Sequence, residues 1–170
     1  MIREMLLEEH SKRQCDRITG YIGTDRQKFG SLMHLFFSGE PVIAQRAAWP
    51  MSYCVRKYPG LIQPYVGQII RNLKKKGLHD AILRNSLRLL QEMEIPRKYH
   101  GQLMDTCFNF IGTHETAVAI KAFALSILGN LAEEYPDILP ELKTIVEDQY
   151  DRESAAFRSR ARKILNNKKR

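Results

Sequence analysis

The residues best suited to catalysis or metal binding in this 170-residue sequence are its histidines and cysteines. They are His10, His34, His79, His100, His114, Cys15, Cys54 and Cys107. Metal sites usually need close ligand pairs such as Cys-x-x-Cys or His-x-x-x-His, and neither spacing occurs. His100, Met104 and Cys107 could share one face of a helix, but we favour core packing as the interpretation of Cys107. We therefore predict no metal ligand and no cofactor.

Motifs of the common enzyme classes are also missing from the sequence. Gly20 and Gly23 belong to the segment GYIG, which lacks the Lys-Ser/Thr pair of a phosphate-binding loop. The Gly-x-Ser-x-Gly nucleophile elbow does not occur, and the acidic residues form no pair that we would assign to acid–base chemistry. The sequence thus predicts no catalytic residue and a protein that is not an enzyme.

Cations recur in the sequence at a regular spacing. The segments VIAQRAAW, DAILRNSL, AVAIKAFA and AAFRSRAR each place one cation inside an Ala-rich or Leu-rich run. The aligned cations are separated by 38, 37 and 37 positions: Arg46, Arg84, Lys121 and Arg158. A second echo, of YPGLIQP by YPDILP, joins Tyr58 to Tyr135. A fixed period of this length is typical of a helical repeat array.

Prolines mark the ends of the helices that must carry these cations. Pro59 ends one helix, because the residue before a proline avoids the helical region. Pro64 lies in the first turn of the next helix, where a missing N–H costs little. We predict an all-α fold without a sheet, in which a helical segment at 2–22 precedes four helix pairs: 25–38 with 40–58, 61–76 with 78–94, 97–112 with 115–134, and 137–150 with 153–166.

Two residues of the first pair carry further expectations. Trp49 stands three positions after Arg46, in register with Leu87, Ala124 and Ala161, and we expect all of this column in the core. Pro50 falls in mid-helix, and a proline there should kink the helix.

The segment ILPELKTIVEDQYDRESAAFRSRARKIL resembles a HEAT repeat, an armadillo-type helical repeat, and the likeness covers about residues 25–166. It implies a right-handed α–α superhelix, a short solenoid in one domain over residues 1–170. Within that domain we expect an N-terminal cap at 1–24, repeats at 25–166 and a basic tail at 167–170.

The resemblance also implies a ladder of ion pairs between neighbouring repeats, formed by the aligned cations and by acids that stand six residues before them. Glu40 and Glu115 have this spacing from Arg46 and Lys121. Two further acids do not, since Asp80 is four residues before Arg84 and Glu153 is five before Arg158. We therefore expect an irregular ladder.

Small bacterial HEAT-like proteins of unassigned activity are similar to this chain, and some of them are labelled adenylosuccinate lyase. That label would imply a longer helical enzyme with a Gly-Ser-Ser loop followed by Met, Lys and Asn-Pro. This sequence has no Ser-Ser pair and is far shorter. We reject that activity.

Charge is unevenly distributed along the chain, whose formal net charge is +8. Residues 58–98 carry a net +5, residues 99–150 a net −6 and residues 151–170 a net +6. Second helices line the concave surface of solenoids, and cations spaced by four share a helix face. The candidate binding residues are two such pairs on second helices, Arg84 with Arg88 and Arg158 with Arg162. Together they could form a phosphate-binding groove.

Two functions follow from this interpretation. The first is a non-catalytic scaffold that binds a protein partner on the concave surface. The second is nucleic-acid binding through the basic groove. A distant alternative is a HEAT-like DNA glycosylase, which uses Trp, Asp and Arg on its concave side. Trp49, Asp80 and Arg84 have those types, but they fit the ordinary repeat pattern.

Cellular context is indicated by features that the sequence lacks. No apolar run is long enough for a membrane span, and no export signal begins the chain. Three cysteines at irregular spacing suit reduced thiols. We expect a cytoplasmic protein without membrane contact, and the sequence leaves the partner and the oligomeric state open.

Overall fold

The computed structural model describes residues 1–38 and 40–166, and this described part consists of helices, turns and loops without a strand. The predicted basic tail at 167–170 lies outside the described residues. The chain divides into two compact units, Met1–Asn85 (unit 1) and Ser86–Arg170 (unit 2), and each is described by itself. The all-α helical repeat fold is confirmed, whereas the single domain and the handedness of a superhelix stay predictions.

The N-terminal segment of unit 1 consists of α1 (Ile2–Glu8) and α2 (Lys12–Ile22). Ser11 separates the two helices, because its Oγ accepts a hydrogen bond from the backbone N–H of Gln14 at 3.1 Å and so caps α2. Gly23 ends α2 with a φ of 50°, a backbone conformation that favours glycine. The predicted helical segment is therefore confirmed as two helices, the second of which is capped by Ser11.

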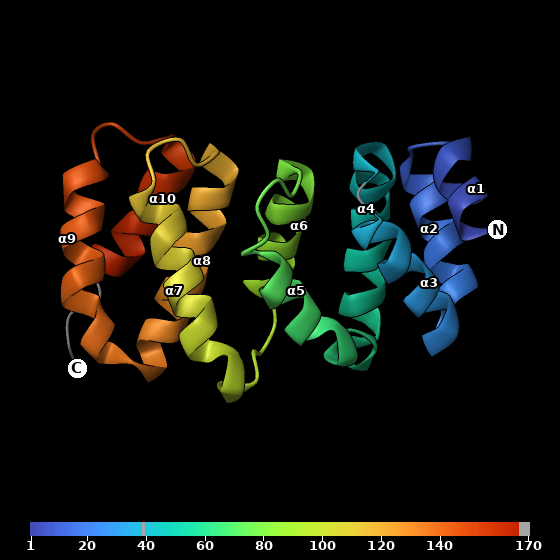
Figure 1. Cartoon of the computed structure of the whole chain (residues 1–170), viewed down its shortest axis with the longest axis horizontal. Coiled ribbons are helices and arrows are strands. Elements are labelled where there is room, and N and C mark those ends of the chain that lie inside the picture. The colour runs from blue at the N-terminus through green and yellow to red at the C-terminus, as the bar shows by residue number, and fades with distance from the viewer. Residues whose placement is uncertain (39, 167–170) are drawn as a thin grey trace. The chain divides into compact units, whose positions relative to one another are not determined.

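The first helix pair of unit 1 is α3 (Arg26–Phe37) with α4 (Pro41–Lys57), and the two helices pack against each other (Figure 1). The carboxylate of Asp25 caps α3, because it accepts hydrogen bonds from two backbone N–H groups of the first turn. These bonds hold the pKa of Asp25 below its usual range. Pro50 is buried inside α4, which continues as a helix through this position.

The second helix pair begins with α5 (Val66–Asn72) and continues with α6 (Asp80–Leu90), which crosses from unit 1 into unit 2. Two short 3-10 helices precede α5, at Pro59–Leu61 and Gln63–Tyr65. The helix predicted at 61–76 is therefore shorter than expected. Pro64, predicted in the first turn of this helix, lies in the 3-10 turn just before it, and Pro59 lies in the 3-10 turn that follows α4, where a missing N–H costs little.

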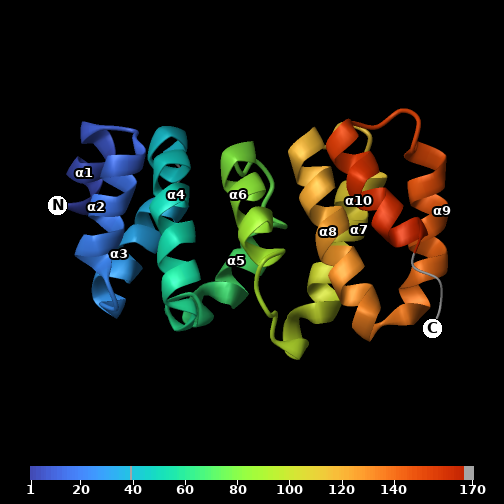
Figure 2. The same ribbon diagram turned by 180° about the vertical axis from the view of Figure 1, so that it is seen from behind.

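Unit 2 contains the remaining two pairs. They are α7 (His100–Gly112) with α8 (Val118–Glu134), and α9 (Leu139–Gln149) with α10 (Ala155–Leu165). Helix α8 packs against both α7 and α10, and Figure 2 shows α8 beside α10. The side chain of Ser154 caps α10. None of the described helices combines the length and apolar character that a membrane crossing requires.

The two Tyr-Pro motifs have the same local structure. The N–H groups of Tyr58 and Tyr135 each donate to the carbonyl four residues earlier, at 2.7 and 2.8 Å, and so close α4 and α8. A 3-10 helix follows in both cases, at Pro59–Leu61 and at Pro136–Ile138. The internal echo in the sequence thus corresponds to a repeated helix-ending turn.

The cores of both units are formed by apolar side chains at helical spacing. Burying each large side chain contributes about 1.5–3 kcal/mol. In the column three positions after the cations, Leu87, Ala124 and Ala161 are fully buried, as predicted. Trp49 is only half-buried, so the core position predicted for it is wrong. Its indole meets the ring of His10 edge-on at 5.5 Å, and His10 is itself exposed and cannot seal the site from solvent.

Candidate binding surfaces

A buried ion pair joins neighbouring repeats in unit 2. The Lys121 ammonium donates to the Glu153 carboxylate at 2.6 Å, and their side chains are only 6% and 13% exposed. Lys121 belongs to α8, and Glu153 stands just before α10, so the pair joins neighbouring repeats. Glu115, which has the regular spacing from Lys121, is exposed. Glu153 takes this place because α10 packs directly on α8.

The equivalent cation in unit 1 has a different partner. Arg46 Nη1 donates to the carbonyl oxygens of Leu6 and Leu7, at 3.0 and 3.1 Å. These carbonyls belong to the last turn of α1, where a cation also complements the negative end of the helix dipole. Glu40, the acid expected to serve the ladder here, pairs with Arg3 of α1 at 2.9 Å. Arg46 therefore ties the N-terminal helices to the first repeat.

The four arginines predicted to bind a partner belong to both units. Arg84 is exposed and lies in unit 1, whereas Arg88 is half-buried and lies in unit 2 on the same helix. On α10, Arg158 is half-buried, and Arg162 Nε donates to the Tyr150 hydroxyl at the end of α9 at 2.9 Å. Their assignment as one binding surface stays a prediction.

Helix α10 carries a second pair of cations, which faces α8. Arg160 Nε donates to Ser126 Oγ at 2.7 Å, and its guanidinium carbon lies 5.5 Å from the centre of the Phe123 ring. Arg160 and Ser126, together with Asn130 and Lys163, border a cleft of about 170 Å³ between the two helices, which we call the α8–α10 cleft. The stacked and hydrogen-bonded guanidinium is held in one position.

A larger and more open hollow lies in unit 1 between the start of α1, the end of α2 and one face of α3. Its volume is about 810 Å³, and its two charged lining side chains, Arg3 and Lys28, are both cations. Lys28 Nζ donates to the Tyr21 carbonyl at 3.2 Å and lies 4.3 Å from the centre of the Tyr21 ring. Both cations also have carboxylate partners, since Arg3 pairs with Glu40 and Lys28 with Asp25.

The histidines and cysteines considered for chemistry have structural surroundings. Buried His100 contacts the Ile95 carbonyl through Nε2 at 2.7 Å and the Tyr135 hydroxyl through Nδ1 at 3.0 Å. Cys107 is fully buried, as predicted, and burial raises the pKa of its thiol. Within the described part of the chain, no three His, Cys, Asp or Glu side chains are grouped so that they could hold a metal ion.

Comparison with known families identifies the chain. A family model described as a HEAT repeat domain matches residues 2–168. The chain belongs to this HEAT repeat family. No curated protein and no solved structure matches it. HEAT repeats generally mediate protein interactions and are typically not catalytic. In this HEAT repeat chain the family match extends through α1 and α2, beyond the residues 25–166 of the predicted resemblance.

The α8–α10 cleft was missed by sequence reasoning. The spacing of four drew attention to Arg158 and Arg162, whereas Arg160 and Lys163 are spaced by three and lie on the α8 side of the helix. The buried positions Phe157, Ala161 and Ile164 could have given the orientation of α10. They fix which cations flank each edge, but the sequence does not say which edge meets α8.

Proposed function

We propose that this HEAT repeat protein is a non-catalytic module that binds a segment of a partner protein on its second helices, with the α8–α10 cleft as the anchoring site. The observation that carries the proposal is the position of Arg160. Its guanidinium is fixed against Ser126 and Phe123 at the edge of a cleft between two neighbouring second helices.

The composition of the cleft supports a protein ligand. Arginine and aromatic residues are enriched among the side chains that dominate binding energy at protein interfaces. Phe123 lies beside Arg160 outside the cleft lining and is half-buried, so it offers apolar area next to the cleft, while Asn130 and Arg160 offer hydrogen-bond donors within it. The cleft also joins two repeats, and a repeat array presents an extended surface of this kind to a bound chain.

Charge narrows the class of partner. Between Ala155 and Asn166, helix α10 and its end carry four cations and no acid: Arg158, Arg160, Arg162 and Lys163. An acidic segment would therefore be attracted to α10 and favoured over a basic one. Glu133 lies on the α8 side of the cleft and would repel an acidic residue bound next to it. The acidic residues of the partner segment should therefore lie on the α10 side.

The test is quantitative affinity capture from a cell extract treated with nuclease, comparing the native chain with Arg160→Glu/Lys163→Glu. We expect at least one protein to be retained by the native chain and reduced about tenfold by the double variant, which corresponds to about 1.4 kcal/mol. The matched control is Arg158→Glu/Arg162→Glu, which makes the same charge change on α10 and should reduce capture much less, because these two side chains do not line the cleft. Equal capture by the native chain and the cleft variant would overturn the cleft as the binding site.

A further inference from the structure

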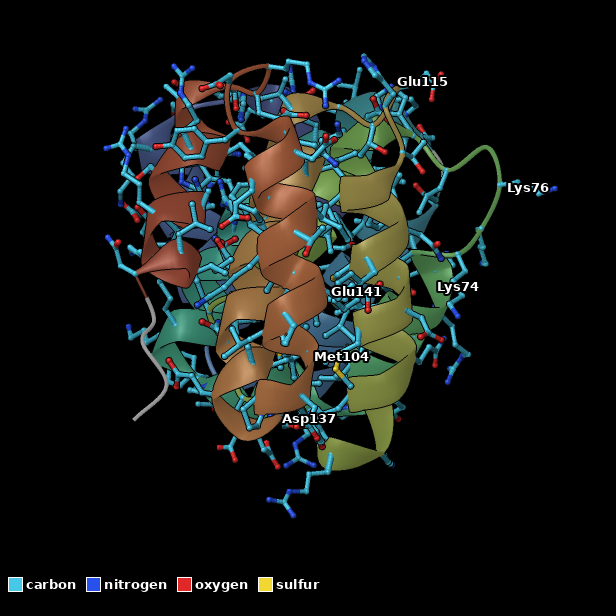
Figure 3. All side chains as sticks on the ribbon, turned by 90° about the vertical axis from the view of Figure 1, so that its left-hand side faces the viewer. Lys74, Lys76, Met104, Glu115, Asp137 and Glu141 are labelled. Carbon is cyan, nitrogen blue, oxygen red and sulfur yellow. The ribbon has the colours of Figure 1, made fainter. Side chains whose placement is uncertain are left out.

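The segment after α5 carries a dense group of positive charge in unit 1. Arg71 lies in the last turn of α5, and Lys74, Lys75 and Lys76 follow it; we call these four residues the basic loop. All four are exposed. Figure 3 shows Lys76 pointing outward from the tip of the loop.

The backbone of this loop is well defined by local contacts. Leu73 is buried, and the N–H groups of Lys74 and Lys75 donate to the carbonyls of Arg71 and Asn72. Gly77 then reverses the chain with a φ of 76°, which a side chain would disfavour. The lysines are therefore held together on one short turn.

Among the residues that the structure describes, no carboxylate forms an ion pair with the basic loop. The sequence has no acidic residue between Pro59 and His79, and none of the four cations pairs with an acid among the described residues. Helix α2 shows the opposite arrangement, because each of its three cations has a carboxylate partner: Lys12 with Asp16, Arg13 with Glu9 and Arg17 with Glu8. The negative end of the α5 helix dipole favours a nearby cation. Arg71 in the last turn is sufficient for this, so the dipole does not account for the three lysines.

The closely spaced positive charges of the basic loop favour a polyanionic ligand. Adjacent like charges on flexible side chains match a polymer whose negative charges are also closely spaced, and duplex DNA carries about one charge per 1.7 Å of its axis. Leu73 is buried and Leu78 half-buried, so the loop offers no exposed apolar side chain for insertion into a lipid surface. It also offers no aromatic ring on which a base could stack.

We propose that the basic loop binds the phosphate backbone of nucleic acid without reading its sequence. This surface is separate from the α8–α10 cleft, because it belongs to unit 1, and it differs from the second-helix arginines considered from the sequence. Lysine suits the task, because a compact ammonium contacts a phosphate from many directions and needs no fixed geometry.

The test is fluorescence anisotropy with a labelled DNA duplex of arbitrary sequence, measured from about 50 to 200 mM salt. Four phosphate contacts predict a slope of about −3 to −4 for log K against log salt. Lys74→Gln/Lys75→Gln/Lys76→Gln should reduce that slope by about 2 to 3 and weaken binding more than tenfold at the lowest salt. Lys76→Gln by itself should reduce the slope by about 1.

The matched control removes the same charge from paired cations. Lys12→Gln/Arg13→Gln/Arg17→Gln should change the affinity less than about threefold, because these side chains already face carboxylates. Arg160→Glu/Lys163→Glu should retain the loop-dependent part of duplex binding, which separates this proposal from the function proposed for the cleft. Circular dichroism of each variant confirms folding.

Three results would overturn the proposal. The native chain could fail to bind the duplex at about 50 mM salt, where phosphate contacts are strongest. The loop and α2 triple variants could weaken binding equally, which would indicate a response to net charge. Phosphatidylserine vesicles or polyglutamate could bind more tightly than the duplex, and the loop would then be a membrane or protein contact.

Discussion

The two units of this protein each place an acid just before a second helix, and these two acids make very different ion pairs. In unit 1, Glu40 stands directly before α4 and pairs with Arg3, and both side chains are about half exposed, at 53% and 52%. In unit 2, Glu153 stands just before α10 and pairs with Lys121, and both side chains are almost entirely buried. Each pair joins an acid that precedes a second helix to a cation of an earlier helix.

The difference shows that the repeat determines where a charged residue stands, whereas burial determines how much its ion pair contributes to stability. Arg3 and Glu40 keep most of their hydration, so their attraction is weak and sensitive to salt. Lys121 and Glu153 lose most of their hydration on folding. The opposite charge of the partner offsets that loss, since a buried charge without a partner is costly. The two pairs should therefore respond very differently to mutation.

Breaking the buried pair of Lys121 and Glu153 should have the largest effect. We expect Lys121→Met to lower the free energy of unfolding by about 3–5 kcal/mol, because it leaves the Glu153 carboxylate buried without a partner. Lys121→Met/Glu153→Leu should recover most of the loss, since an apolar pair needs no hydration. Urea denaturation followed by circular dichroism measures both variants.

Fluorescence of Trp49 locates this effect, because the sequence has one tryptophan and it lies in unit 1. A shift in the circular dichroism transition without a shift in fluorescence would place the loss in unit 2. If the Lys121→Met variant unfolded at the same urea concentration as the native chain, the buried pair would contribute nothing to stability.

The thiols extend the comparison to high pH. Burial raises the pKa of Cys54, in unit 1, from 9.0 to about 11, and it raises that of Cys107, in unit 2, further. Both thiols stay protonated in the folded chain but ionise near pH 9 in the unfolded chain. The stability they contribute is complete below pH 9 and is lost as the pH rises towards the folded value.

For Cys54 this loss should amount to about 2–3 kcal/mol by pH 11. Urea denaturation at pH 8 to 11 should show a shallower fall for Cys54→Ala than for the native chain, because the variant lacks the thiol that ionises on unfolding. Comparing the two slopes removes the contribution of lysines and tyrosines, which both proteins share. Parallel slopes would contradict the prediction.

Breaking the exposed pair of Arg3 and Glu40 should have the smallest effect. We expect Arg3→Gln to change the free energy of unfolding by less than about 1 kcal/mol, because the pair with Glu40 is largely hydrated. The difference should disappear at about 1 M salt, where screening acts within a few ångströms. A loss as large as that of Lys121→Met would show that the exposure of an ion pair does not determine its contribution to stability.

Much of the architecture could be predicted because its signals are local. The cations at intervals of 38, 37 and 37 residues marked the second helices, and the two Tyr-Pro motifs marked helix ends that the structure confirms. The error at Trp49 has a tertiary cause. A position in register with buried residues becomes half-exposed when its neighbour, His10, is itself in contact with solvent.

The binding surfaces were harder to predict for a related reason. The spacing of the α10 arginines showed which of them share an edge, but the contact with Ser126, 34 residues away along the chain, decided which edge borders a cleft. The charge of the basic loop was visible in the sequence. Its exposure and its lack of a partner depend on how the rest of unit 1 folds.

The sequence by itself determined that the chain forms paired helices, where most of them begin and end, and which position of each repeat carries a cation. These properties depend on residues within a turn or two of each other, through capping, proline stereochemistry and helical period. Only the tertiary structure decided that Lys121 is buried against Glu153, that Arg46 binds the carbonyls of α1, and that Arg160 is fixed over Phe123. Burial and the choice of a partner depend on residues about 30 to 40 positions apart, which meet only when neighbouring helices pack.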